Sequence, residues 1–104
     1  MSDAYRIVYS ARALADLVEA HAFVTRDSAD RAAELAGRIV DAIDALQTFP
    51  YRNAIEVRNR NTGSPFRKAI VAPYIIYYRI QERKRSIHTV TIRHAARRRP
   101  RRFD

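Results

Sequence analysis

The amino-acid sequence predicts one α+β domain, in which an antiparallel helix hairpin packs on one face of a mainly antiparallel sheet of three to four strands (β-α-α-β-β-β). A chain of 104 residues that is 47% hydrophobic and 30% charged has room for a single core. Apolar residues recur at helical spacing in its first half and at the two-residue period of strands in its second half. We expect one domain over residues 1–104, with a basic tail over 97–104 that is extended or disordered when unbound.

The first half predicts one strand and two helices. Residues 5–9 are aromatic and β-branched, and Ser10 can cap a helix that runs to about residue 26. The apolar stripe of this helix consists of Leu14, Leu17, Val18, His21 and Ala22. A second helix follows a cap at Ser28 and ends near residue 48, because Pro50 disfavours a helical residue before it. So short a turn predicts a hairpin whose two stripes face the same way.

The second half predicts a sheet. After a polar loop with a short extended piece near residues 55–58, strands are expected over residues 66–72, 74–81 and 86–94, with a charged turn over 82–85. One face of the central strand carries Tyr74, Ile76, Tyr78 and Ile80. Alternation divides the last strand into one face with His88, Val90, Ile92 and His94, and another with Ile87, Thr89, Thr91 and Arg93.

The net charge of +9 is unevenly distributed along the chain. Residues 1–50 hold five bases and eight acids (net −3), whereas residues 51–104 hold fifteen bases and three acids (net +12). Eighteen of the twenty bases are arginine, which suits phosphate and carboxylate recognition. This pattern indicates a polyanionic partner, either nucleic acid or an acidic protein, with a merely solvated face as the alternative. We expect Arg67, Arg79 and Arg93, from three successive strands, to gather on the sheet face that the helices leave uncovered.

Several kinds of chemistry are disfavoured by the residues present. The chain has no cysteine and only two glycines, so it lacks thiolate zinc ligands, a phosphate-binding glycine loop and a nucleophile elbow. His21 and His88 are expected to be packed, hydrogen-bonded core residues, and we expect no metal and no cofactor. No apolar run is long enough for a membrane span, and the start of the chain has no apolar signal stretch, so we expect a cytoplasmic protein that does not bind membranes. The remaining Arg, Tyr and His can bind an anionic surface or stabilise a phosphoryl transition state.

An ordered set of landmarks resembles the RelE/ParE superfamily of toxins from bacterial type II toxin–antitoxin systems. The landmarks are the opening segment 5–10, the spacing of Ala13, Asp16 and Leu17, the pair Phe49-Pro50, Arg67, the segment 73–80, and His94-Ala95-Ala96-Arg97 followed by Pro100. The resemblance spans nearly the whole chain and is closest to the ParE-like, plasmid-stabilisation branch.

The resemblance implies one of two activities. ParE-like members bind and poison DNA gyrase without being enzymes, whereas RelE-like members are ribosome-dependent mRNA endoribonucleases. RelE-like enzymes commonly have an arginine where this chain has Ile75, and a tyrosine near the C-terminus that is missing beyond Arg97. The resemblance therefore favours gyrase inhibition over cleavage of mRNA on the ribosome. A non-toxic basic nucleic-acid-binding module is a further alternative.

The resemblance also implies which residues meet which partner. The expected target-binding residues are Arg67, Tyr78, Arg79, Arg93, His94, Arg97, Arg98 and Arg99. The ribonuclease alternative would use Arg67, Arg79, His94 and Arg97. A cognate antitoxin with an acidic C-terminal segment is expected to bind Leu14, Leu17, Arg67 and Arg79. The structural alternatives are that Tyr78 only packs in the core and that Arg67 only pairs with Glu56 or Glu82.

Overall fold

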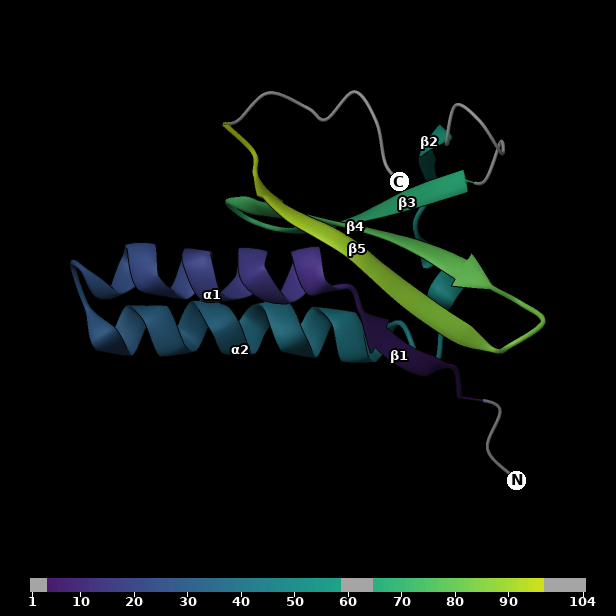
Figure 1. The fold of residues 1–104 in the computed structure, drawn as a ribbon, viewed down its shortest axis with the longest axis horizontal. Coiled ribbons are helices and arrows are strands. Elements are labelled where there is room, and N and C mark those ends of the chain that lie inside the picture. The colour runs from purple at the N-terminus through teal and green to yellow at the C-terminus, as the bar shows by residue number, and fades with distance from the viewer. Residues whose placement is uncertain (1–3, 59–64, 97–104) are drawn as a thin grey trace.

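A helical hairpin lies along one side of a five-stranded sheet in the computed structural model of the chain (Figure 1). The structure describes residues 4–58 and 65–96. The elements are β1 (Arg6–Tyr9), α1 (Ala11–Thr25), α2 (Ala29–Ala45), the short 3-10 helix η1 (Pro50–Arg52), β2 (Ile55–Arg58), β3 (Pro65–Val71), β4 (Tyr74–Gln81) and β5 (Ser86–His94). The predicted α+β class and the order of the elements are confirmed.

The strand order in the sheet is β1-β5-β4-β3-β2. β1 runs parallel to β5, with Arg6 opposite Ser86, and every other pair is antiparallel. A parallel pair needs a crossover connection, and the chain between β1 and the rest of the sheet includes the helical hairpin. The extended piece expected near residues 55–58 pairs with β3, so the sheet has five strands, one more than the upper end of the predicted range.

Both predicted helix caps are present. Ser10 Oγ accepts a hydrogen bond from the N–H of Ala13 at 2.9 Å, and Ser28 Oγ accepts one from the N–H of Arg31 at 3.2 Å. Each bond satisfies one of the N–H groups that the first turn of a helix leaves unpaired, and is typically worth about 1 kcal/mol. Local sequence chemistry therefore fixes where both helices begin.

The core lies between the helical hairpin and the adjacent face of the sheet, which we call the core face. Its largest fully buried apolar side chains are Ile39, Ile43 and Leu46 from the α2 region and Ile76, Tyr78 and Ile87 from the sheet. Removing one such side chain from water contributes about 1.5 to 3 kcal/mol. Tyr74, Ile76, Tyr78 and Ile80 all belong to this cluster, as their alternation predicted.

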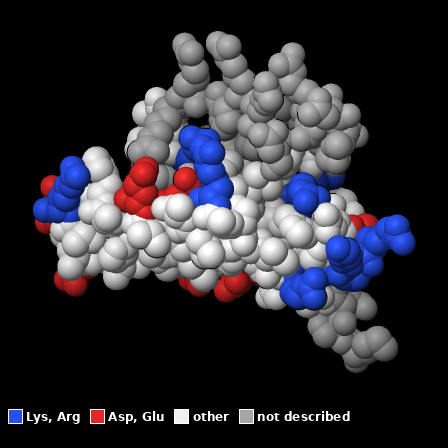
Figure 2. All heavy atoms as spheres, in the orientation of Figure 1, with Lys and Arg blue, Asp and Glu red and all other residues white. Residues whose placement is uncertain are grey.

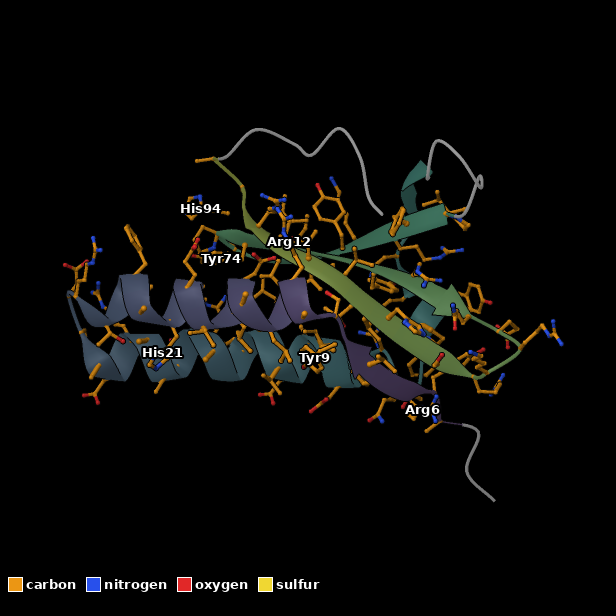
Figure 3. All side chains as sticks on the ribbon, in the orientation of Figure 1. Arg6, Tyr9, Arg12, His21, Tyr74 and His94 are labelled. Atoms are coloured by element: carbon orange, nitrogen blue, oxygen red, sulfur yellow. The ribbon has the colours of Figure 1, made fainter. Side chains whose placement is uncertain are left out.

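The buried face of α1 differs from the predicted stripe. Ala13 and Ala20 are buried and Leu17 and Val24 are partly buried, whereas Leu14 is 50% exposed and Val18 68% exposed. His21, predicted to be a core residue, is exposed (Figure 3). Apolar residues and alanines occur around much of the circumference of α1, so their spacing alone does not define one buried side. The small side chains of Ala13 and Ala20 allow their side of the helix to pack closely. The spacing of apolar residues therefore predicted the helix correctly but predicted the wrong side of it to be buried.

The other side of the sheet, which we call the second face, carries its own apolar cluster. Phe66 (2% exposed) and Tyr77 (3% exposed) pack there with the partly buried Ile75 and Val90. The expectation of a bare second face is therefore wrong at its centre, where large aromatic side chains need burial. His88 is half-buried on this face rather than in the main core.

Within residues 4–58 and 65–96, no helix combines the length and the apolar character that crossing a membrane requires.

Candidate binding surface

Arg79 and Arg93 both lie on the second face of the sheet. Arg79 follows Ile75 and Tyr77 at the two-residue period of β4, and Arg93 of β5 is directly opposite Ile75. The two arginines therefore flank the apolar cluster of Phe66 and Tyr77 from different strands. Because Phe66 and Tyr77 are themselves buried, the contact groups that this face offers to another macromolecule are the arginines.

A β-bulge in β5 changes which residues share a face. Tyr77 is opposite Thr91, but Tyr78 is opposite Thr89, so Val90 is an extra residue on β5. Ile87 and Ile92 consequently both reach the core cluster, although they are an odd number of residues apart. The predicted division of this strand into strictly alternating faces is therefore wrong beyond the bulge, because one extra residue reverses the alternation.

Arg67 does not join Arg79 and Arg93, because it is opposite the core residue Tyr78. Its Nη1 donates to the carbonyl oxygen of Asn53 at 2.6 Å, and its guanidinium lies 4.9 Å from the centre of the Tyr51 ring. The structure places Arg67 against the segment that follows α2. The three arginines expected on one face are thus divided between two.

Tyr78 is completely buried and holds the same segment in place. Its Oη donates to the carbonyl oxygen of Pro50 at 2.8 Å and accepts from Asn53 Nδ2 at 3.2 Å. Burial raises the pKa of its phenol, which keeps the hydroxyl protonated as a donor. The side chain presents no surface to a target in this structure, and the packing alternative describes its place in the fold.

His94 lies at the end of β5, beside the ring of Tyr74 (Figure 3). The two rings meet edge to face with their centres 5.2 Å apart, and His94 Nδ1 accepts the N–H of Ala96 at 3.0 Å. These contacts hold His94 on the core face of the sheet and Ala96 beside it. Arg97, Arg98 and Arg99, the remaining predicted target-binding residues, lie outside the described residues.

Glu82, which the sequence suggested only as an ion-pair partner of Arg67, instead joins three other parts of the fold. Glu82, in the β4–β5 turn, accepts hydrogen bonds from Tyr5 Oη at 2.7 and 2.9 Å and from Tyr51 Oη, and it forms a 2.9 Å ion pair with Arg85 Nη1. Its partners are thus the start of β1, η1 and the turn itself. The sequence feature that could have indicated this role is that Glu82 is the single acid in a turn whose other residues are bases.

These contacts shift the pKa values of the groups involved. The hydrogen bonds from Tyr51 and then Tyr5, with Arg85 as a further partner, lower the pKa of Glu82. The bond to Glu82 in turn raises the pKa of Tyr51 to about 12. Both shifts favour a carboxylate that accepts from protonated phenols, so the cluster acts as a fixed structural unit at neutral pH.

A second carboxylate, that of Asp16, accepts hydrogen bonds from the part of β5 that does not pair with β1. β1 pairs with β5 only as far as Thr89. Beyond it, Ser10 Oγ donates to the carbonyl oxygen of Val90 at 2.7 Å, and Asp16 of α1 bonds the next two residues. Asp16 Oδ2 accepts from Thr91 Oγ1 at 2.6 Å and from the N–H of Ile92 at 2.9 Å. Sequence periodicity places Asp16 off the apolar stripe, and no local pattern indicates that a strand edge lies beside it.

The four residues predicted to bind an antitoxin do not form one exposed surface. Leu14 is exposed on α1, while Leu17 packs against the core. Leu14 and Val18 form a short exposed apolar patch one helical turn apart, which we call the α1 patch. Arg67 and Arg79 lie on opposite faces of the sheet, so a single short segment does not contact all four predicted residues at one place.

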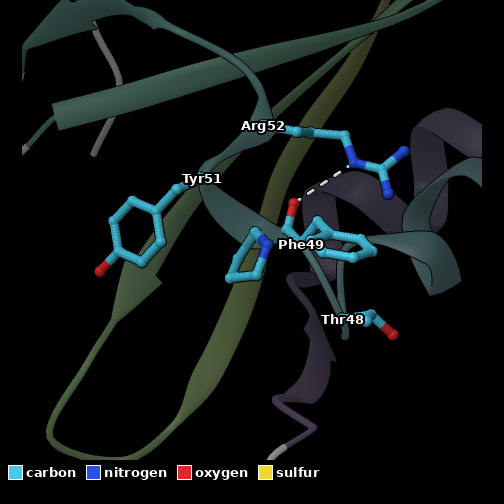
Figure 4. Close-up of a pocket in the computed structure, with 5 residues that line it drawn as sticks. Thr48, Phe49, Tyr51 and Arg52 are labelled. Carbon is cyan, nitrogen blue, oxygen red and sulfur yellow. Dashed lines mark hydrogen bonds between the residues drawn. The ribbon is translucent and has the colours of Figure 1, made fainter.

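A shallow pocket of about 530 Å³ lies after the end of α2 and is lined by residues 48–52 (Figure 4). Arg52 Nε donates to the carbonyl oxygen of Phe49 at 3.3 Å, and its guanidinium lies 5.5 Å from the centre of the Phe49 ring. Phe49 and Tyr51 are both exposed. The pocket therefore combines exposed aromatic surface with one cation.

Comparison with known proteins gives one family. The family model described as the ParE toxin of the type II toxin–antitoxin system parDE matches residues 7–99. The Sinorhizobium fredii protein Y4kP is 37% identical over 92 residues, which cover 86% of this chain and 88% of the relative. Toxin RelE2 of Caulobacter vibrioides is 33% identical over 92 residues, which cover 88% of this chain and 97% of the relative.

Two solved structures have the same fold. A chain from the chromosomal ParDE system of P. aeruginosa aligns with a TM-score of 0.68 at 19% identity, covering 89% of this chain and 98% of that chain. A chain from the RelBE2 toxin–antitoxin complex of Mycobacterium tuberculosis aligns with a TM-score of 0.64 at 19% identity, covering 90% and 94%. The family model and the two relatives show that the chain belongs to the ParE toxin family of type II toxin–antitoxin systems, within the RelE/ParE superfamily.

Proposed function

We propose that this toxin inhibits growth by binding and poisoning DNA gyrase, and that it is not itself a ribonuclease. The observation that carries the proposal is the division of the ribonuclease candidates between two faces of the sheet. Arg67 and His94 are opposite core-face tyrosines, whereas Arg79 lies on the second face. Acid–base catalysis needs its groups within hydrogen-bond reach of one reacting atom. These three side chains do not share a surface, which favours binding over catalysis.

The target-binding surface in this proposal is the second face. Arg79 and Arg93 flank its aromatic centre, and the basic segment that includes Arg97, Arg98 and Arg99 follows β5 in the chain. Arginine is enriched at protein interfaces, and the buried Phe66 and Tyr77 support these arginines from within the sheet face. Ile75, at the middle of this surface, supplies apolar contact and no charge for a phosphoryl transition state.

The deciding experiment compares two activities of the purified protein. We expect inhibition of gyrase in a DNA supercoiling reaction and no cleavage of mRNA on translating ribosomes. Cleavage of ribosome-bound mRNA without an effect on gyrase would refute the proposal and favour the RelE-like alternative, to which the likeness to toxin RelE2 gives some support.

We further propose that a cognate antitoxin neutralises the toxin by covering the α1 patch with an apolar segment that also carries acidic side chains. The structural relatives come from toxin–antitoxin systems, and Leu14 and Val18 are large apolar side chains left exposed on α1. The net charge of +12 over residues 51–104 favours acidic side chains in the part of the partner that reaches the sheet, and should speed its association. Copurification with the product of a neighbouring gene that has an acidic C-terminal segment is the expected result. Failure to copurify with that product would refute this part of the proposal.

A further inference from the structure

A group of polar side chains lies on the second face next to the β4–β5 turn, at the end of the sheet away from His94. We call it the hairpin-end cluster, and it consists of Arg6, Arg79, Gln81, Lys84 and His88. The register places Arg79 directly opposite His88, and both Arg6 and Gln81 opposite Ser86 from its two neighbouring strands. Three adjacent strands and the turn thus contribute to one surface. Figure 3 labels Arg6 at the start of β1, close to this end of the molecule.

Gln81 lies between Arg79 and His88 and is placed to hydrogen-bond both. With its amide oriented to match its neighbours, Gln81 Oε1 accepts from Arg79 Nη1 at 2.8 Å and from Nη2 at 3.3 Å, and Nε2 donates to His88 Nε2 at 3.0 Å. The buried Ser86 Oγ lies 3.1 Å from the same histidine nitrogen. An amide orients the guanidinium without neutralising it, so its charge remains available to a ligand.

The cluster combines several positive charges with no paired acid. Within residues 4–58 and 65–96, no carboxylate forms an ion pair with Arg6, Arg79 or Lys84, whereas the nearby Arg85 is paired with Glu82. Burial first, and then the positive charges of Arg79, Lys84 and Arg6, lower the pKa of His88. Figure 2 shows Lys and Arg gathered at the end of the molecule that carries the turn and β1, while most Asp and Glu in that view lie along the helices. The local field therefore favours an anion.

We propose that the hairpin-end cluster binds the phosphodiester backbone of a nucleic acid strand. Phosphate oxygens are contacted mainly by Arg, Lys and neutral polar side chains, which are the groups present here. The proposal adds a nucleic-acid contact to the toxin and does not depend on gyrase being its target.

Two observations favour a nucleic acid over an acidic peptide. β5 is paired on both sides at Ser86, and at the edge strand β1 the backbone of Tyr5, beside Arg6, is bonded to Gln47 (N–H to carbonyl oxygen at 3.1 Å, and Gln47 Nε2 to the Tyr5 carbonyl oxygen at 3.2 Å), so a peptide has little edge to add to here. All five side chains of the cluster are polar, whereas a protein partner usually needs a buried apolar anchor at the centre of its interface. A phosphate backbone needs only the charges and donors that the cluster provides.

The test measures binding of labelled single-stranded DNA, duplex DNA and RNA by fluorescence anisotropy over a series of salt concentrations. The variant Arg6→Gln/Arg79→Gln/Lys84→Gln is compared with Arg26→Gln/Arg31→Gln/Arg38→Gln, which removes the same charge from the helical hairpin. We expect the slope of log affinity against log salt to fall by about 0.7 to 0.9 for each phosphate that the first variant no longer neutralises. The control variant should bind nearly as the parent does. Comparing the three probes identifies which nucleic acid is preferred.

Any of the following results would overturn the inference. The first is an equal loss of affinity in the control variant, which would mean that net charge alone binds the probe. The second is competition by polyglutamate as effective as by DNA at equal charge, which would indicate an acidic protein.

The location of the site is checked by NMR. The signals of the His88 ring and of the Gln81 side-chain amide should shift when DNA is added, and unshifted signals would also contradict the site. Gyrase inhibition without nucleic-acid binding refutes only this inference, whereas nucleic-acid binding without gyrase inhibition refutes only the proposed target.

Discussion

At the scale of single residues, Glu82 shows how a charged surface side chain can organise a fold. It accepts from two tyrosines that are far from it in sequence, and it neutralises Arg85. Hydrogen bonds to an ionised acceptor are stronger than those between neutral groups. The same residue is therefore a structural contact for the start of β1 and for η1, rather than a spare surface charge.

The lowered pKa of Glu82 predicts a pH-dependent contribution to stability. Because the folded-state pKa lies below that of the unfolded chain, the contribution is present above the unfolded carboxyl pKa and is lost as the pH falls through the folded value. Chemical denaturation should show that Glu82→Gln is less stable than the parent at neutral pH and that the difference shrinks in acid. The exposed Glu34→Gln serves as control, and an equal pH response from it would contradict the prediction.

Arg85 adopts a left-handed backbone conformation, with φ of 49°. Its side chain contacts Glu82 and lies 4.1 Å from the centre of the Tyr5 ring, so substitution changes both contacts and backbone strain. Arg85→Ala and Arg85→Gly remove the same side-chain interactions, but only glycine adopts this conformation without cost. We expect Arg85→Gly to be more stable than Arg85→Ala by about 1 kcal/mol in urea denaturation. Equal stability of the two variants would show that the turn relaxes.

At the scale of elements, the α1–β5 contact depends on Asp16. Asp16→Ala leaves the N–H of Ile92 and the hydroxyl of Thr91 without their acceptor, which should reduce the free energy of unfolding by about 1 to 3 kcal/mol. Asp16→Asn retains one side-chain oxygen and should be less destabilised. Hydrogen exchange at the Ile92 amide should be faster in Asp16→Ala, and unchanged protection there would contradict this role for Asp16.

The α1 patch predicts the effect of substitutions on antitoxin binding. In Leu14→Asp/Val18→Asp, two exposed apolar side chains become acidic, so an apolar and acidic partner segment should bind much more weakly while the fold is retained. Copurification after co-expression measures the weakening, and circular dichroism checks the fold. Ala33→Asp, at an exposed position of α2, should still copurify. Normal copurification of the double variant would place the antitoxin elsewhere.

At the scale of the whole molecule, the two faces of the sheet have different roles. The core face holds the hydrophobic core, whereas the second face presents Arg79 and Arg93 beside an aromatic cluster. In Arg79→Gln/Arg93→Gln we expect weaker growth inhibition and weaker gyrase inhibition, with little change in stability. Growth after induction and supercoiling assays measure the effect, and Arg31→Gln/Arg38→Gln is the control. Full toxicity of the first variant would exclude this face as the target surface.

Local features of the fold were predictable because their causes lie within a few residues. Ser10 and Ser28 cap helices through their own hydroxyls, and the strict alternation of Tyr74–Gln81 identifies its core side. The candidate site was less predictable. The extra residue at Val90 reverses the alternation of faces within β5. Arg67 lies on the core face, where its guanidinium donates to the carbonyl oxygen of Asn53. Neither effect has a signal in the residue types nearby.

The sequence by itself determined the helical and extended segments, the charge division between the halves and the family resemblance, because propensity, capping and composition act locally. The tertiary structure alone decided which side of α1 is buried, how Glu82 and Asp16 are used, and which arginines share a surface. Those outcomes depend on contacts such as the one between Tyr5 and Glu82, which are 77 residues apart, and on a register that one bulged residue shifts.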